Sequence, residues 1–321
     1  MLRSALWFIR LMRPAHQAAL VVIFLGVRYG IVRPWLLMHY LEDPLPEYQF
    51  FLALLASLFL CCAAVLINDY FDWQDDRLAR PEDVIVGRHL SRRTVIVWHG
   101  VLTVLGLLPL CYLSLVWGNL YLLFLFPLGA RVLWYYSKLY KQRLIYSVPL
   151  LFLFLLSVPL LPLLFEFLAI NRALWQILAV NNLSVFGFLI SGGIYALLIA
   201  LLGLTRAFEK QIRYYAQRTS FRTETLPDRF GLQSAKMVVL SLKLLLFLLL
   251  FVIGVYFYGI APNAQTGLIP LLYLGLFVGM PLLVSTVLGV LPTDHAPRWA
   301  RFFTTTTSLF VILLPLLLGW F

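Results

Sequence analysis

The stretch INDYFDWQDDRLARPEDVIVGR, residues 67–88, marks a sharp change from apolar to charged sequence. It directly follows FFLALLASLFLCCAAVL, residues 50–66, in which no side chain is charged. Ionisable groups are costly at membrane depth, so carboxylates that begin where a membrane-length segment ends are candidates for a function. The stretch holds six of the chain's fourteen acidic residues: Asp69, Asp72, Asp75, Asp76, Glu82 and Asp83.

The composition indicates a protein embedded in a membrane. Of its 321 residues, 62% are hydrophobic and 12% are charged, and the mean hydropathy is +0.90. A soluble domain is about half apolar and about a quarter charged. Backbone polar groups in lipid must be satisfied within their own segment, so long apolar runs predict helices. We predict an all-α protein with nine transmembrane helices: 16–38, 49–67, 94–115, 118–134, 145–165, 183–205, 237–258, 267–291 and 302–321.

The basic residues predict the orientation of the chain. With the N-terminus in the cytoplasm, most of the 25 Lys and Arg residues fall on the inner side, as the positive-inside rule requires. Arg28 and Arg33 are exceptions in the outer part of the first span, and we expect them to snorkel outward or to face a cavity. Topology and anionic lipid headgroups explain the net charge of +11 without nucleic acid.

The chain is expected to form one membrane domain, residues 1–321, in a multi-pass protein of a cell inner membrane. Two long polar loops, 68–93 and 206–236, follow the second and sixth spans and are expected on the cytoplasmic side. They divide the helices into two similar halves, about 16–165 and 183–321. Long loops between spans are usually functional or disordered, and the motifs within these two favour a function.

Three carboxylates in the first loop are spaced to share one face of a helix. Asp69, Asp72 and Asp76 fall within an arc of about 60° at helical spacing, and Asn68 can orient a carboxylate or a water. Carboxylate oxygens combined with substrate phosphates and water form Mg²⁺ sites. A solvated, charged helix end explains the spacing about equally well, and the position at the end of a span favours the metal site.

This pattern, Asn68-Asp69-xx-Asp72-xxx-Asp76, resembles the first signature of the UbiA superfamily of intramembrane prenyltransferases. Further segments typical of that family occur elsewhere in the chain, in the same order as in the family. The similarity extends over nearly the whole chain. They are RLMRP at 10–14, the Arg-Pro, Gly-Arg and Ser of ARPEDVIVGRHLS at 79–91, YSKLYK at 136–141 and TLPDRFG at 225–231.

The resemblance implies nine helices around a central, lipid-accessible cavity and Mg²⁺-dependent transfer of an isoprenyl group. The expected partners are a prenyl diphosphate, an unidentified acceptor and membrane lipid; a protein partner is possible but not indicated. The resemblance implies that Mg²⁺ is held by Asn68, Asp69, Asp72 and Asp76. In this interpretation the candidate diphosphate ligands are Arg80, Arg88, Arg206, Lys210 and Arg213, and the candidate catalytic residues are Asp72, Lys141 and Tyr136.

The second acidic motif expected from the family is degenerate in this chain. Counting back from Thr-Leu-Pro, its acidic positions hold Gln211, Tyr214 and Arg218. Counting from the end of the sixth span, they hold Arg206, Glu209 and Arg213. One helical face here collects Arg206, Glu209, Lys210, Arg213 and Gln217, although the positive-inside rule would place some basic residues in this loop in any case.

Three interpretations of this basic face remain open. Its cations could bind the diphosphate directly in place of a second metal site. They could instead pair with the three aspartates, in a non-catalytic relative that binds a prenyl lipid or a partner. Finally, the Arg206-Ala207-Phe208-Glu209 segment is similar to an element of the superfamily branch that transfers phosphoribose to a polyprenyl phosphate.

Overall fold

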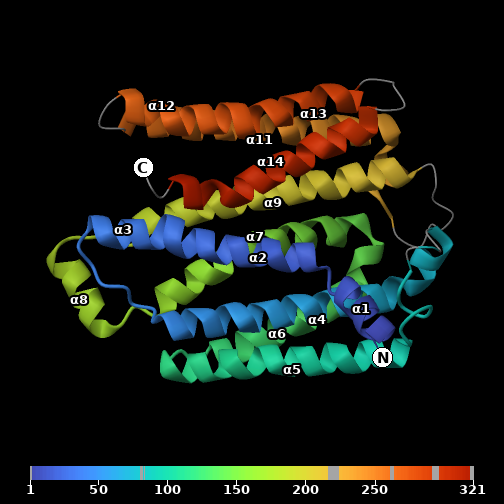
Figure 1. The fold of residues 1–321 in the computed structure, drawn as a ribbon, viewed down its shortest axis with the longest axis horizontal. Helices are drawn as coiled ribbons and strands as arrows, with labels where there is room; N and C mark the ends of the chain where they lie inside the picture. Colours follow the sequence, from blue (N-terminus) through green and yellow to red (C-terminus); the bar gives the residue numbers. More distant parts are fainter. Residues whose placement is uncertain are drawn as a thin grey trace.

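The computed structural model describes residues 2–79, 82, 84–215, 224–260, 264–290 and 296–318, and these form helices and connecting turns without any strand. The long helices run side by side along the longest axis of the molecule (Figure 1). Four residues named above, Arg80, Asp83, Gln217 and Arg218, lie outside the described residues.

The helices follow one another along the chain as a long, almost continuous series. They are α1 (Leu2–Leu11), α2 (Pro14–Val27), the π-helix η1 (Arg28–Val32), α3 (Arg33–Met38), α4 (Glu47–Ala79), α5 (Arg92–Val116), α6 (Leu122–Lys138), η2 (Tyr140–Gln142), α7 (Leu144–Leu168), α8 (Arg172–Val180), α9 (Phe186–Tyr214), α10 (Leu226–Phe230), α11 (Leu232–Ile260), α12 (Ala264–Leu272), the π-helix η4 (Tyr273–Gly279), α13 (Met280–Val290) and α14 (Ala296–Leu318).

Eight helical segments in the described part of the chain are long and apolar enough to cross a membrane. They correspond to eight of the nine predicted spans, with α2, η1 and α3 forming one continuous segment, Pro14–Met38. The predicted span 118–134 corresponds to α6, which has 17 residues and is shorter than the shortest of the eight, Trp299–Leu316. The ninth span and the cytoplasmic N-terminus remain predictions.

Both predicted polar loops are partly helical. The helix of the second predicted span does not end at residue 67, because α4 continues for a total of 33 residues to Ala79 and carries the three aspartates on its last turns. Likewise α9 runs through the predicted loop start at residue 206 and ends at Tyr214. The change in polarity near residues 67 and 205 therefore marks a change of surroundings and not the end of a helix.

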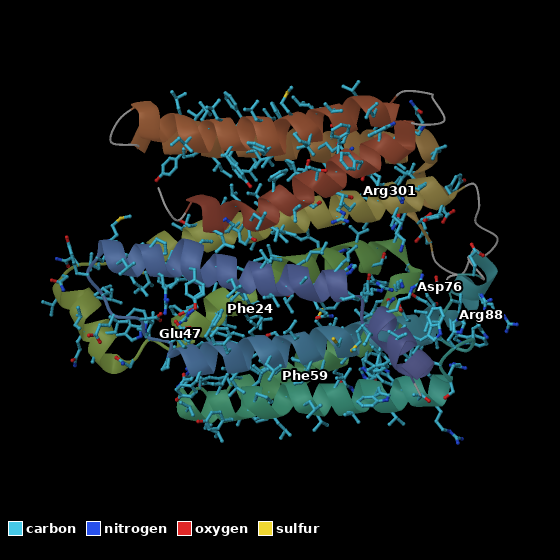
Figure 2. The ribbon with its side chains drawn as sticks, in the orientation of Figure 1. Phe24, Glu47, Phe59, Asp76, Arg88 and Arg301 are labelled. Carbon is cyan, nitrogen blue, oxygen red and sulfur yellow. The ribbon has the colours of Figure 1, made fainter. Side chains whose placement is uncertain are left out.

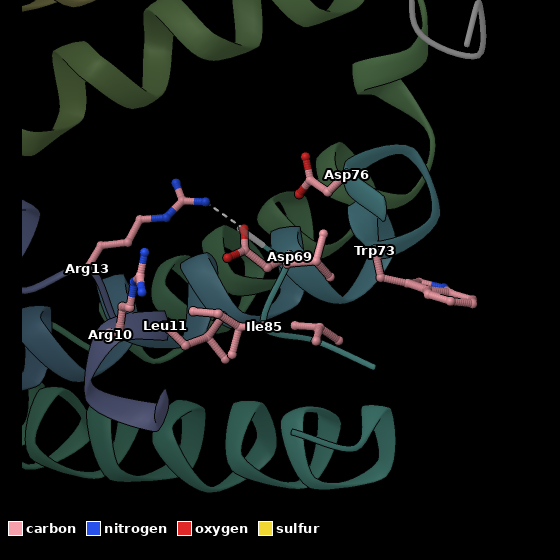
Figure 3. Close-up of a pocket in the computed structure, with 9 residues that line it drawn as sticks. Arg10, Leu11, Arg13, Asp69, Trp73, Asp76 and Ile85 are labelled. Atoms are coloured by element: carbon pink, nitrogen blue, oxygen red, sulfur yellow. Dashed lines mark hydrogen bonds and ion pairs between the residues drawn. The ribbon is translucent and has the colours of Figure 1, made fainter. Parts of the chain in front are cut away.

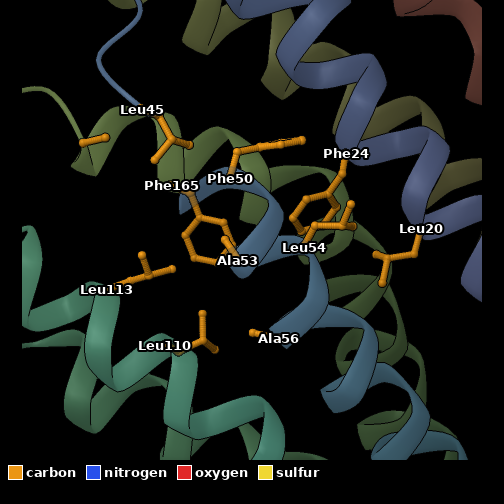
Figure 4. Close-up of a cluster of buried hydrophobic side chains, with 11 residues drawn as sticks. Leu20, Phe24, Leu45, Phe50, Ala53, Leu54, Ala56, Leu110, Leu113 and Phe165 are labelled. Carbon is orange, nitrogen blue, oxygen red and sulfur yellow. The ribbon is translucent and has the colours of Figure 1, made fainter. Parts of the chain in front are cut away.

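The interior of the first half is a cluster of aromatic and aliphatic side chains (Figure 4). Three phenylalanines are at most 1% exposed: Phe24 of α2, Phe50 of α4 and Phe165 of α7. The centroid of the Phe24 ring lies 6.3 Å from the centroid of each of the other two rings. Leu110 and Leu113 add the face of α5. This packing fixes α4 against α2, α5 and α7 and so fixes the direction in which its polar end points.

A buried charge cluster lies at the end of the molecule where Glu47 is found, opposite the end that holds Asp76 (Figure 2). Arg28 is 0% exposed, and its Nη1 donates to Glu166 Oε1 at 2.5 Å while its Nη2 donates to Asp43 Oδ2 at 2.9 Å. Arg33 also bonds to Asp43 and Glu47. The expectation that Arg28 snorkels outward is wrong, because these carboxylates neutralise the guanidinium inside the protein.

Candidate functional site

Several polar segments meet at one end of the molecule, which we call the site end. The last turns of α4, the start of α2 and the last turns of α9 all reach it (Figure 1). Asp76, Arg88 and Arg301 lie there (Figure 2). The acidic face of α4 is defined as Asp69, Asp72 and Asp76, and the basic face of α9 as Arg206, Lys210 and Arg213.

Asp69 is bonded to a basic side chain from the start of α2. Arg13 Nη2 donates to Asp69 Oδ1 at 2.6 Å (Figure 3), and Asn68 Nδ2 donates to the same oxygen at 3.3 Å. Arg13 precedes Pro14, the first residue of α2, and adopts a left-handed backbone conformation with φ 53°. The Arg13-Pro14 pair thus turns the chain into α2 and places a guanidinium at the carboxylate.

Asp72 is bonded to a basic side chain from the α6–α7 connection. Lys141 Nζ donates to Asp72 Oδ2 and, at 2.9 Å, to Asn68 Oδ1. Asn68 Nδ2 also donates to Asp72 Oδ2 at 3.0 Å. Tyr136 lies within electrostatic range of Asp72, and its ring packs edge-on against Phe154. The structure therefore brings Asn68, Asp69, Asp72 and Lys141 into one hydrogen-bonded network.

Asp76 faces the same pocket as Asp69. The pocket has a volume of about 180 Å³ and is lined by Arg10, Arg13, Asp69, Trp73 and Asp76 together with apolar residues of α1 and of segment 84–86 (Figure 3). Asp69 lies within electrostatic range of both other aspartates. Two cations and two carboxylates thus surround one polar hollow at the site end.

Arg88 lines a second pocket, on which Trp73 and Arg77 also border. Gly87 allows the turn that presents Arg88, since its φ of +82° is strained for other residues and its N–H donates to Leu90 O at 2.7 Å. A Cβ on Gly87 would also come within 3.5 Å of the Trp73 ring. Ser91 ends this turn by capping α5, as it accepts from Thr94 N at 3.1 Å.

The basic face of α9 lies near the start of α2. His16 of α2 is within electrostatic range of Arg13, Arg206 and Lys210, and the last turns of α9 reach the same end of the molecule as the start of α2 (Figure 1). Arg213 lies further along α9, with its guanidinium 5.8 Å from the ring centroid of Tyr214.

The one acidic residue among these turns of α9 is already paired. Lys243 Nζ of α11 lies 2.6 Å from Glu209 Oε1, and Thr304 Oγ1 of α14 donates to the same oxygen at 3.2 Å. Lys243 is 3% exposed and Thr304 1% exposed. This contact joins three helices, and its carboxylate is directed at a buried lysine.

The TLPDRFG segment has a structural explanation. Asp228 Oδ2 accepts from the Thr225 backbone N at 2.8 Å and from Thr225 Oγ1 at 2.6 Å, which starts α10 with the reciprocal capping typical of such sequences. Glu224 Oε2 accepts from Leu144 N at 3.0 Å, and Gln211 Oε1 accepts from Leu226 N at 3.0 Å. The segment therefore ties the starts of α7 and α11 to the end of α9.

The donors on the acidic face fit Mg²⁺. Among the residues that the structure describes, no three His, Cys, Asp or Glu side chains form a ready-made cage. Mg²⁺ does not require one, since it usually binds one or two carboxylates and completes its shell with water and phosphate oxygens. Asp69 and Asp72 supply such hard oxygens, and both accept from Asn68 Nδ2. Arg13 and Lys141 balance their charge.

Sequence reasoning misses three of these interactions. The Arg13-Pro14 pair can be recognised as part of the RLMRP segment, but the sequence does not show that Arg13 forms an ion pair with Asp69. The sequence alone gives Lys243 no evident role. A lysine within an apolar span usually pairs with a carboxylate of another span, and Glu209 is the acidic residue of α9. Arg28 and Glu166 could be paired by the same reasoning, because they are residues of opposite charge within two different spans.

The fold and the site define a multi-helical membrane protein with an acidic helix end that faces basic side chains. The sequence model of the UbiA prenyltransferase family matches residues 32–320, so the chain belongs to that family. No curated protein matches its sequence.

Solved structures share the fold at low sequence identity. An apo UbiA homologue from Aeropyrum pernix K1 is 15% identical with a TM-score of 0.65, over 96% of this chain and 99% of that one. A UbiA homologue from Archaeoglobus fulgidus bound to GPP and Mg²⁺ is 15% identical with a TM-score of 0.55, over 98% and 100%. A third, described as a digeranylgeranylglyceryl phosphate synthase, is 16% identical with a TM-score of 0.54, over 97% and 98%.

Proposed function

We propose that the chain is a Mg²⁺-dependent transferase that moves an isoprenyl group from a prenyl diphosphate to an acceptor at the site end. The observation that carries the proposal is the network in which Asn68 joins Asp69 and Asp72 while Arg13 and Lys141 bond to them. A family member with this network has both the oxygen ligands for a metal and the donors for a diphosphate.

In this proposal the basic side chains share the binding of the diphosphate. Arg13 and Lys141 transfer hydrogen bonds from the carboxylates to phosphate oxygens, and Arg88 and the basic face of α9 supply further donors. Mg²⁺, when bound to the acidic face, supplies neutralisation of the charge that develops on the leaving diphosphate. Tyr136 is proposed to lie near the allylic carbon, with the prenyl tail among the helices. Arg80 is proposed as a diphosphate ligand from the sequence alone.

The test is release of pyrophosphate from geranyl diphosphate by the purified chain in nanodiscs with Mg²⁺ and a panel of acceptors. We expect Asp72→Asn to abolish the release, because it removes a charged metal ligand. Asp75→Asn is the matched control, since Asp75 lies outside the arc of about 60° that holds the acidic face, and we expect near-normal activity. Equal rates for Asp72→Asn and the unaltered chain would refute the metal role.

A non-catalytic function is the second candidate, because Arg13 and Lys141 already neutralise Asp69 and Asp72. It predicts no pyrophosphate release under any Mg²⁺ concentration, together with binding of a prenyl lipid. In that case Asp72→Asn should instead lower the unfolding midpoint, since it leaves Lys141 without its charged partner.

A further inference from the structure

The two sides of the site end differ in what they can offer a metal ion. The acidic face presents carboxylate oxygens, which are the ligands that Mg²⁺ and Mn²⁺ prefer. Among the described residues of the last turns of α9, Glu209 is the only carboxylate, and it is bordered by Arg206, Lys210 and Arg213. The number of metal ions that the site binds therefore depends on Glu209.

Glu209 is committed to a buried contact. Its Oε1 bonds both to Lys243 Nζ at 2.6 Å and to Thr304 Oγ1 at 3.2 Å. Lys243 is 3% exposed, so separating it from Glu209 would leave an ammonium group among apolar side chains, which is strongly unfavourable. The lysine thus both neutralises the carboxylate and holds it toward α11 and α14.

Besides Glu209, the last turns of α9 carry three basic residues, Arg206, Lys210 and Arg213. These turns reach the same end of the molecule as the acidic end of α4 (Figure 1). Fixed cations in this position attract phosphate oxygens and repel a divalent cation. A diphosphate between the two sides would meet carboxylates and metal on α4 and guanidinium and ammonium groups on α9.

We infer that the site binds a single divalent cation, on the acidic face of α4, and that the basic face of α9 binds the diphosphate where a second metal ion would otherwise be needed. Lys243 is the positioning residue that keeps Glu209 from acting as a ligand. This inference rests on the proposed function and specifies its metal stoichiometry.

The experiment is a Mn²⁺ titration of the full chain in nanodiscs with geranyl thiolodiphosphate, an analogue that resists ionisation. Electron paramagnetic resonance at low temperature reports the Mn²⁺ retained after filtration, with the filtrate as the background. We expect one Mn²⁺ per chain and the six-line spectrum of an isolated ion. Two ions per chain with an exchange-coupled spectrum would overturn the inference.

Two triple variants locate the ion. Arg206→Asp with Arg213→Asp and Lys243→Met places acids around Glu209 at the spacing of the acidic face and releases Glu209 from its lysine, and we expect a second Mn²⁺ and a coupled spectrum. The matched control, Arg206→Gln with Arg213→Gln and Lys243→Met, removes the same cations without adding ligands, and we expect one Mn²⁺ with weaker binding of the analogue. One ion in the acidic variant would contradict the assignment of the basic face.

A third variant tests Lys243 and Glu209 directly. Glu209→Gln with Lys243→Met removes the pair without leaving a buried charge, so the chain should fold and should still bind one Mn²⁺. Loss of that ion would make Glu209 a ligand and overturn the inference. If the chain binds two Mn²⁺ and releases pyrophosphate, only the stoichiometry is refuted. If the chain neither binds Mn²⁺ nor releases pyrophosphate, the proposed function is refuted as well.

Discussion

At the scale of single residues, Asn68 connects three other side chains of the candidate site. Its amide nitrogen donates to Asp69 and Asp72, and its oxygen accepts from Lys141. The amide therefore holds two like-charged carboxylates together, and the lysine fixes which way the amide points. A change at any one of these side chains should disturb the others.

Lys141→Gln should lower the rate of pyrophosphate release by about 10-fold or more, because hydrogen bonds to charged groups each contribute about 1.5–3 kcal/mol. The matched control is Lys138→Gln, since Lys138 is exposed at the end of α6 and its side chain is not part of the network. Rates and unfolding midpoints measured together separate loss of function from loss of structure. Equal effects of the two substitutions would refute the special role of Lys141.

The sequence predicts the members of this network better than their partners. Asn68, Asp69 and Asp72 can be found because a helix brings residues three and four apart together, and Lys141 because its segment resembles a family motif. The Arg13–Asp69 contact joins residues 56 positions apart, and the Glu209–Lys243 contact depends on how α9 and α11 pack. Such long-range pairs follow from tertiary structure, which a local pattern does not contain.

Among the helices, α4 explains why the acidic residues stand at the edge of the apolar region. Its 33 residues span about 50 Å at 1.5 Å per residue, whereas the hydrocarbon core is about 30 Å thick. Its last turns must therefore extend beyond the lipid. The loop predicted at 68–93 is longer than the connection in the structure, because α4 remains helical after it leaves the lipid. The polarity of the sequence indicates the surroundings of a helix and not where the helix ends.

The opposite end of α4 is held by the buried Arg28 cluster. Arg28→Gln should reduce the free energy of unfolding by about 3–5 kcal/mol, because it leaves Glu166 buried without its cation. Arg33→Gln, at a side chain 34% exposed, should cost about 1 kcal/mol or less. Unfolding of each variant by dodecyl sulfate in mixed micelles measures the two free energies of unfolding. A similar, small loss for the two variants would show that Arg28 is not a fixed point of the fold.

For the whole molecule, we propose that the N-terminus and the site end face the cytoplasm. A cysteine introduced at Tyr40, which is 98% exposed, should react with an impermeant maleimide in intact cells. One introduced at Lys236 of α11 should react only after the membrane is opened. The native Cys61, Cys62 and Cys111, which lie within α4 and α5, provide the background in the unaltered chain. The reverse pattern would invert the topology.

The overall architecture is largely predictable, because long apolar runs have few alternatives in lipid. The shorter elements are not. Helix α8, with 9 residues, and α10, with 5, are too short for a reliable periodic signal, and their caps at Asn171 and Thr225 become evident only from the bonds they make. Nothing in the local sequence indicates that α14 packs beside α2.

Gly30, in η1, permits the close approach of the continuous segment Pro14–Met38 to α14. A Cβ at Gly30 would overlap the carbonyl oxygen of Pro315, so Gly30→Ala should force the helices apart and lower the unfolding midpoint. Gly129→Ala in α6, where nothing lies within 4 Å, is the control, and it should stabilise the chain by up to about 1 kcal/mol. Equal midpoints would mean that the two backbones do not approach this closely.

The pairing of α2 with α14 also limits when the protein can assemble during its synthesis. The ribosome makes α2 before α14, so the surface around Gly30 lacks its α14 neighbour until that helix is inserted. Until then this surface must be covered by lipid or by an insertion chaperone. Nascent chains that stall before α14 should therefore be the ones that quality-control proteases recognise, even though Arg13 and Asp69 are both already made.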